Sequence, residues 1–149
     1  MKEYPYRKMN EMREILEVLQ MPSKLKNTRT ILTLLAVARV KEKSKWSQVE
    51  ESYARTHDMI VFMNEYYPNK GGTDLKRGGY SENSRETIRD DSVSPLCSMA
   101  VMEHNGAKSQ SEKSSYRLTK EFATLLRAYG TENWEEELCY YCEIGRAHV

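Results

Sequence analysis

The sequence predicts a mainly α-helical domain with one small β-hairpin. Several segments place apolar residues at helical spacing. Two short strand-like segments flank a polar loop late in the chain, and they follow directly after a helix with a polar, well-capped start. This order of elements is that of a winged helix-turn-helix preceded by an N-terminal helical extension. With 149 residues, the chain is long enough to bury one hydrophobic core.

Two helices are predicted in the first forty residues. Residues 7–20 form an amphipathic pattern, and Pro22 is expected to end that helix. A second helix, from about Thr28 to Arg39, is apolar nearly all round, which favours the buried centre of a bundle. We therefore divide the chain into an extension, 1–27, and a winged domain, 28–130.

Loops and a third helix connect this bundle to the candidate functional segment. Residues 41–45 are expected to form a charged loop and residues 46–50 a capped turn or short helix. A helix over 57–67 is expected to stop at Pro68, and the Gly-rich residues 68–80 are expected to form a mobile loop.

The segment Tyr80–Arg89 has the signature of a helix start. Asn83 is the expected N-cap, and Glu86, three residues later, is expected to complete a capping box. The first turn of such a helix favours phosphate, because its backbone N–H groups and the positive end of the helix dipole are free. A solvent-exposed helix without a partner would show the same capping pattern.

Side chains suited to contact DNA gather at this helix start. Arg85 and Arg89, four residues apart, share one face, and Arg, Asn, Ser and Thr carry donors that can meet base edges in a major groove. The helix is expected to run from Ser84 to about Ser98, with a kink or early stop caused by Pro95. The candidate DNA-contacting residues of this segment are Asn83, Ser84, Arg85, Thr87 and Arg89.

A hairpin and two further helices complete the prediction. Residues 100–104 and 115–119 are expected to be paired strands, and Lys108 and Lys113 in the loop between them would contact backbone phosphate. Thr119 is expected to cap a helix over 120–129, and an acidic helix is expected to begin at Trp134.

The last residues are assigned separately. Residues 131–143 are expected to begin a linker or helix that leads to a catalytic domain outside this sequence. Residues 144–149, Ile-Gly-Arg-Ala-His-Val, match the in-frame translation of a sequencing adapter. We therefore expect the natural protein to differ there and to continue.

The net charge of the sequence is only +1. It therefore lacks the strongly basic balance of many small autonomous nucleic-acid binders. There is neither a signal-peptide pattern nor an apolar run long enough to cross a bilayer, so a cytoplasmic protein without membrane contact is expected.

Cys139 and Cys142 have CxxC spacing but no second ligand pair, so no metal site is predicted. No catalytic motif and no small-molecule cofactor site is evident either.

In combination, several of these segments resemble the N-terminal helix-turn-helix domain of the BsuBI/PstI family of type II restriction endonucleases. The resemblance covers roughly residues 10–141, and the block 83–89 is its most specific part. It rests on the segments Glu14-Ile-Leu, Leu32–Ala36, Trp46-Ser47, Asn83–Arg89, Tyr116–Thr119 and Leu125–Gly130. This chain departs from the family pattern after Arg89, where Asp90, Asp91 and Pro95 replace a basic and amide-rich continuation.

The resemblance implies a two-part enzyme that cuts double-stranded DNA at a short palindromic site. Its nuclease domain would require Mg²⁺, held by carboxylates that lie outside this sequence, and a palindromic target would favour a homodimer. Two alternatives stay open at this point: a non-enzymatic winged-helix transcriptional regulator, and a helical domain that binds other proteins.

Overall fold

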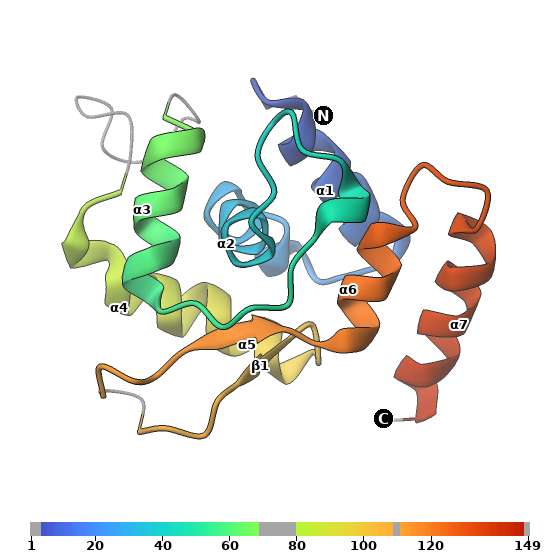
Figure 1. Cartoon of the computed structure of the whole chain (residues 1–149). Coiled ribbons are helices and arrows are strands. Elements are labelled where there is room, and N and C mark those ends of the chain that lie inside the picture. Colours follow the sequence, from blue (N-terminus) through green and yellow to red (C-terminus); the bar gives the residue numbers. More distant parts are fainter. Residues whose placement is uncertain (1–3, 69–79, 109–110, 148–149) are drawn as a thin grey trace.

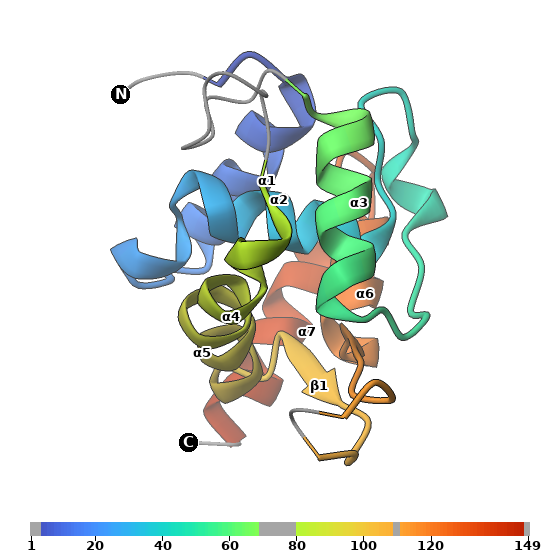
Figure 2. The same cartoon turned by 90° about the vertical axis from the view of Figure 1, so that its left-hand side faces the viewer.

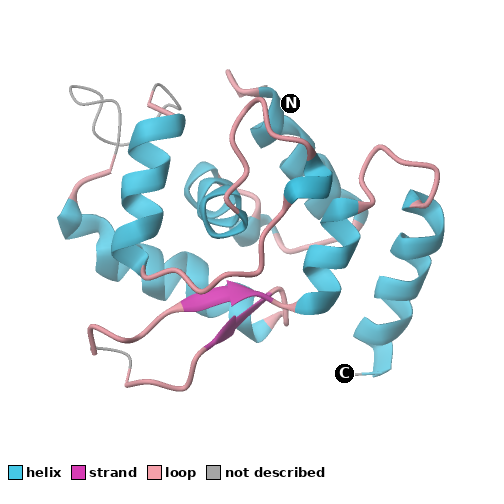
Figure 3. Ribbon diagram, in the orientation of Figure 1, coloured by secondary structure: helices cyan, strands magenta, loops and turns pink. Residues whose placement is uncertain are grey.

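The computed structural model describes residues 4–68, 80–108 and 111–147, and it confirms a mainly helical fold with one small hairpin (Figures 1 and 3). The α-helices are α1 (Arg7–Val18), α2 (Thr28–Ala38), α3 (Thr56–Tyr66), α4 (Arg85–Ile88), α5 (Ser94–Ser98), α6 (Lys120–Arg127) and α7 (Trp134–Ala147). The strands are β1 (Met102–His104) and β2 (Tyr116–Leu118). Short 3₁₀ turns lie at Ser23–Leu25, Trp46–Gln48 and Glu82–Ser84. In the described residues, no helix combines the length and the apolar character that a membrane span requires.

Helix α2 lies at the centre of the molecule, as its sequence predicts (Figure 1). All its residues from Thr30 to Ala38 are buried, because nearly every side chain is apolar and other elements surround the helix. The side chain of Asn27 caps its start by accepting the N–H of Thr30 at 2.8 Å. Helix α1 contributes its apolar side to the same hydrophobic core. The proposed boundary at residue 27 stays a prediction.

Helix α1 ends differently from the prediction. Its last helical residue is Val18, and Gln20 takes a left-handed conformation with φ of 58°. The chain has therefore already turned before it reaches Pro22. At the other end, the carboxylate of Glu42 accepts the backbone N–H groups of Arg7 and Lys8 at 2.7 and 2.9 Å. The predicted charged loop thus caps α1.

A third segment of the chain pairs with the hairpin through a single β-bridge, which the sequence does not predict. Strands β1 and β2 pair antiparallel, with Met102 opposite Leu118 and His104 opposite Tyr116. Ala54, just before α3, forms a bridge with Tyr116, in which each residue donates its N–H to the other's carbonyl at 2.8 and 2.9 Å. The order helix, bridge, helix, helix, hairpin is that of a winged helix-turn-helix.

The later helices agree with the sequence. Thr119 accepts the N–H of Phe122 and so caps α6, which buries Phe122, Leu125 and Leu126. Helix α7 packs along α6 on its outer side and continues through Ala147 (Figure 1). The boundaries proposed at residues 130 and 143 stay predictions. Most of the predicted Gly-rich loop, 69–79, lies outside the described residues.

Tyr67 holds the end of α3 in the hydrophobic core, and its hydroxyl should make the stability of the protein depend on pH. Its side chain is fully buried, and its hydroxyl donates to the carbonyl of Val40 at 2.7 Å. Burial raises the pKa of Tyr67 above its ordinary value, so the folded state holds the proton more tightly than the unfolded state. This contribution is complete below about pH 10, the ordinary tyrosine pKa, and is lost as the pH rises beyond it.

We therefore expect Tyr67→Phe to lower the free energy of unfolding by about 1–2 kcal/mol at pH 8. The difference between wild type and variant should shrink at pH 11, because the wild type alone has by then lost part of this contribution. Urea unfolding followed by circular dichroism at both pH values measures it, with the exposed Tyr140→Phe as a control. A difference that is the same at both pH values would contradict the assignment.

Candidate nucleic-acid interface

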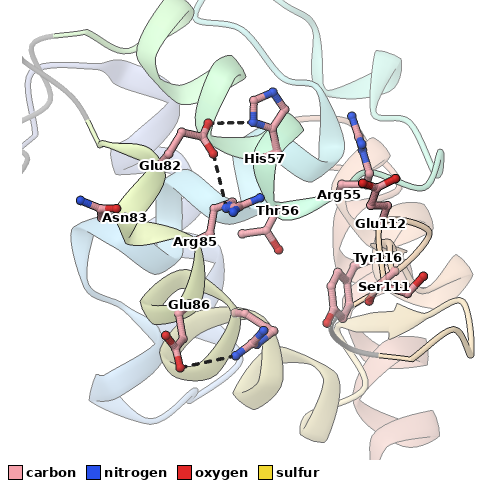
Figure 4. A pocket seen from close by; sticks show the side chains of 12 residues that line it. Arg55, Thr56, His57, Glu82, Asn83, Arg85, Glu86, Ser111, Glu112 and Tyr116 are labelled. Atoms are coloured by element: carbon pink, nitrogen blue, oxygen red, sulfur yellow. Dashed lines mark hydrogen bonds and ion pairs between the residues drawn. The ribbon is translucent and has the colours of Figure 1, made fainter.

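A cleft of about 790 Å³ opens on the face of the molecule where three segments converge (Figure 4). We call it the groove. One side is the start of α3, the second is α4 with the turn before it, and the third is the hairpin; Figure 2 shows how these segments are arranged. The residues that line it are Arg55, Thr56, His57, Glu82, Asn83, Arg85, Glu86, Arg89, Ser111, Glu112, Ser114 and Tyr116.

The predicted capping box at the start of the recognition segment, residues 82–98, is wrong. Asn83 lies inside the 3₁₀ turn Glu82–Ser84 and not at a helix N-cap. Ser84 occupies the N-cap position of α4, with no side-chain hydrogen bond to the helix. The 3₁₀ turn satisfies its own backbone, since the N–H of Ser84 donates to the carbonyl of Ser81 at 2.9 Å.

Pro95 does not stop the recognition segment. A π-helical turn, Arg89–Val93, joins α4 to α5, and the N–H of Ser94 donates to the carbonyl of Arg89, five residues back. Pro95 therefore lies in the first turn of α5, a position at which helices tolerate proline. The segment continues to Ser98, the end that the sequence predicts.

The recognition segment is anchored to α2 on its inner side. Ile88, Val93 and Leu96 are fully buried. In the π-turn, the fully buried Ser92 Oγ accepts the Nε–H of Arg29 at 3.0 Å and lies 2.9 Å from the Thr30 hydroxyl. Buried hydroxyls without partners are costly, so this cluster fixes how the segment is rotated about its axis. Its outer side consequently faces the groove.

The arginines on that outer side are held by carboxylates. Arg85 Nε lies 3.4 Å from Glu82, whose other carboxylate oxygen lies 2.7 Å from His57 Nδ1. Figure 4 shows Glu82 joined to both other side chains, so that it links the start of α3 to the start of α4. The Arg85 side chain is 60% exposed, so it remains accessible to a ligand.

Arg89 is more enclosed than Arg85. Its side chain is 26% exposed, and its Nε lies 3.0 Å from Asp90. The hydrogen bond to Asp90 raises the pKa of Arg89, so the guanidinium stays charged at any physiological pH. Both arginines therefore face the groove as cations with groups already oriented for hydrogen bonding.

Three of the seven predicted contact residues line the groove: Asn83, Arg85 and Arg89. Thr87 is exposed on α4 and Ser84 is half-buried, but neither lines the groove. Lys108 and Lys113 are exposed in the hairpin loop, whose Ser111, Glu112 and Ser114 form the groove wall instead. Whether these residues contact DNA stays a prediction.

The groove wall formed by the start of α3 was not predicted from the sequence. Arg55, Thr56 and His57 come from its start, and Arg55 is paired with Asp58 at 3.3 Å. The available signal was the pair of basic side chains at the beginning of a helix that precedes the recognition segment. Without the fold, nothing in the sequence places this pair opposite Arg85.

The described residues contain no group of three or more His, Cys, Asp or Glu side chains that could hold a metal ion. Cys139 and Cys142 are exposed on α7. The carboxylates of the groove are engaged with, or lie near, arginine and histidine side chains. This part of the molecule is therefore suited to binding an ordered ligand with hydrogen-bond donors and acceptors.

Comparisons with known proteins agree with this architecture. The chain is 27% identical over 132 residues to the type II restriction enzyme BsuBI of Bacillus subtilis, an alignment that covers 86% of this chain and 39% of that protein. Its fold is similar to the structure of the SdaI restriction endonuclease, with a TM-score of 0.78, 21% identity, and coverage of 93% of this chain and 43% of that one. The chain thus spans less than half the length of either protein. The family described as the BsuBI/PstI restriction endonuclease HTH domain matches residues 6–147, and the chain belongs to that family.

Proposed function

We propose that this chain is the DNA-binding, target-recognition domain of a type II restriction endonuclease that cleaves double-stranded DNA at a short palindromic site. The groove is the observation that supports it: an arginine-bearing recognition segment stands beside a hairpin on one face of the molecule. In winged helix-turn-helix proteins the recognition helix enters the major groove with its N-terminal side chains toward the base edges. Here Asn83, Arg85 and Arg89 hold that position.

The candidate residues fall into two groups: some would contact the bases, and the others would contact the backbone phosphates. Arg85 and Arg89 can each donate two hydrogen bonds to one guanine, at O6 and N7, which is the commonest specific contact. Lys108 and Lys113 in the hairpin, with Ser84 and Thr87 on the recognition segment, would contact backbone phosphates. Phosphate contacts position the protein, whereas base contacts select the sequence.

Cleavage is assigned to a separate nuclease domain. The carboxylates that hold its Mg²⁺ would come from that domain, because the described residues here do not form a metal site. A palindromic target would be read by two copies of the protein related by a twofold axis. The contribution of this chain is binding and orientation of the duplex.

Gel-shift titration of the whole chain with double-stranded DNA tests the proposal. Binding should weaken steeply as salt rises, because protein contacts release cations condensed on the phosphates. Lys113→Ala should weaken binding to all sequences about equally and reduce the slope of log affinity against log salt by about 1. The exposed Lys24→Ala, outside the groove, is the matched control. A chain that ignores duplex DNA at low salt would contradict the proposed function.

A further inference from the structure

The groove is not a simple basic surface. Its lining holds three arginines, Arg55, Arg85 and Arg89, but also three glutamates, Glu82, Glu86 and Glu112. Affinity for DNA comes largely from cations that neutralise phosphates, and a carboxylate placed near phosphates is repelled. Each glutamate in the groove therefore lowers general affinity unless it has a partner of its own. Two of these glutamates, Glu82 and Glu86, lie on the recognition segment, and of these two Glu86 has the weaker partner within the protein.

Glu82 is well engaged, since it lies 2.7 Å from His57 and 3.4 Å from Arg85. The one charged partner of Glu86 in the described part of the chain is Arg89, at 3.8 Å. Arg89 has a closer carboxylate in Asp90, at 3.0 Å. The Glu86 side chain is 79% exposed, and an exposed pair at this separation contributes little to stability.

Glu86 also takes no part in a capping box at the helix start. The capping box that the sequence predicts does not form: no side-chain hydrogen bond closes the start of α4. Glu86 nevertheless lies on the groove side of the recognition segment, between Arg85 and Arg89 in the sequence (Figure 4). An accessible, weakly paired carboxylate thus stands among the arginines proposed to read bases.

We propose that Glu86 is a specificity-determining residue whose carboxylate accepts a hydrogen bond from the N4 amino group of a cytosine in the major groove. The inference rests on the proposed function and adds the base that one side chain selects. In the major groove, cytosine presents an amino donor alone, adenine presents an amino donor beside the N7 acceptor, and guanine and thymine present acceptors. A carboxylate can only accept, so cytosine is the base whose edge offers it a donor without an acceptor beside it.

This assignment explains why a glutamate is compatible with a DNA-binding groove. Glu86 would disfavour most sequences, through repulsion from phosphates and from carbonyl edges, and favour those with cytosine at one position. Specificity is a difference between two affinities, and a repulsive element increases it as effectively as an attractive one. Arg89 keeps Asp90 as its partner while Glu86 turns to the base.

The test is selection from a pool of duplexes with randomised sequence, using the wild type and Glu86→Gln in parallel. Wild type should select cytosine at one position, and replacing that C·G pair by T·A should weaken binding by roughly 5- to 150-fold. Glu86→Gln should lose most of this preference, because an amide both donates and accepts. It should also bind unselected duplexes more tightly, since one repulsive charge is gone.

The exposed Glu132→Gln, between α6 and α7, removes the same charge outside the groove and should keep the wild-type preference. If Glu86→Gln strengthens binding to all duplexes equally and leaves the selected sequence unchanged, the base-reading role is overturned while the proposed function stands. If the wild type binds no duplex at all, the proposed function fails and this inference fails with it.

Discussion

Replacing both Arg85 and Arg89 with alanine is expected to weaken binding of duplex DNA by roughly 2–6 kcal/mol, from about 1–3 kcal/mol for each base-contacting arginine. The effect has two sources. The variant loses the hydrogen bonds of both guanidinium groups, and Arg55 is then the only arginine that faces the glutamates of the described groove lining. Glu86 and Asp90 would also lose the cation that they share. The groove would change from balanced to acidic.

The measurement is a titration of labelled duplex with wild type and variant at one fixed salt concentration, with single variants to complete a double-mutant cycle. The two arginines lie on one segment, so their effects need not add. Arg7→Ala with Lys24→Ala is the matched control, because it removes two exposed cations that do not line the groove. Equal losses in this control and in the Arg85/Arg89 variant would show that only net charge matters, and would contradict a specific interface.

Phe122→Ala is expected to have the largest effect on stability, lowering the free energy of unfolding by about 3–5 kcal/mol. Phe122 is fully buried in α6, and its ring packs edge-on against Tyr141 of α7, with 5.8 Å between ring centroids. Removing the ring leaves a cavity and also deprives α7 of one of its contacts with α6. In a chain of this size the midpoint of thermal unfolding should fall by roughly 2–4 °C for each kcal/mol lost.

Thermal and urea unfolding followed by circular dichroism measure this loss. Tyr140→Ala removes an aromatic ring from the same helix α7, but from a side chain that is 61% exposed, and should change stability by less than about 0.5 kcal/mol. A loss below about 1 kcal/mol for Phe122→Ala would mean that α6 and α7 do not share the packing described.

The parts of the fold that follow local patterns could be predicted from the sequence. Helix α2 is an example, since its apolar residues and its Asn27 cap are contiguous and sufficient to specify a buried helix. The cap of α6 at Thr119 is equally local. The same reasoning fails at Asn83, because a capping box and a 3₁₀ turn compete for the same residues and distant contacts decide between them. Residue types alone do not reveal that outcome.

Distant contacts also hold the recognition segment further along, at Ser92. Its hydroxyl is held by Arg29 and Thr30 of α2, and this anchor lies in the π-turn that carries the chain past Pro95. A π-helical turn leaves no periodic pattern in the sequence from which it could be predicted. The groove wall from α3 was missed for a similar reason, since Arg55 and His57 come together with Arg85 only when the helices pack. The sequence therefore identified the recognition segment but not its surroundings.

The bridge between Ala54 and Tyr116 limits the order in which parts of the fold can form. It joins residues far apart in the chain, and contacts of that kind form late in folding, because a long loop must close before they contribute any energy. During synthesis, the ribosome must release the second hairpin strand before this bridge and the hairpin wall of the groove can form. A half-made chain thus has helices but an incomplete groove.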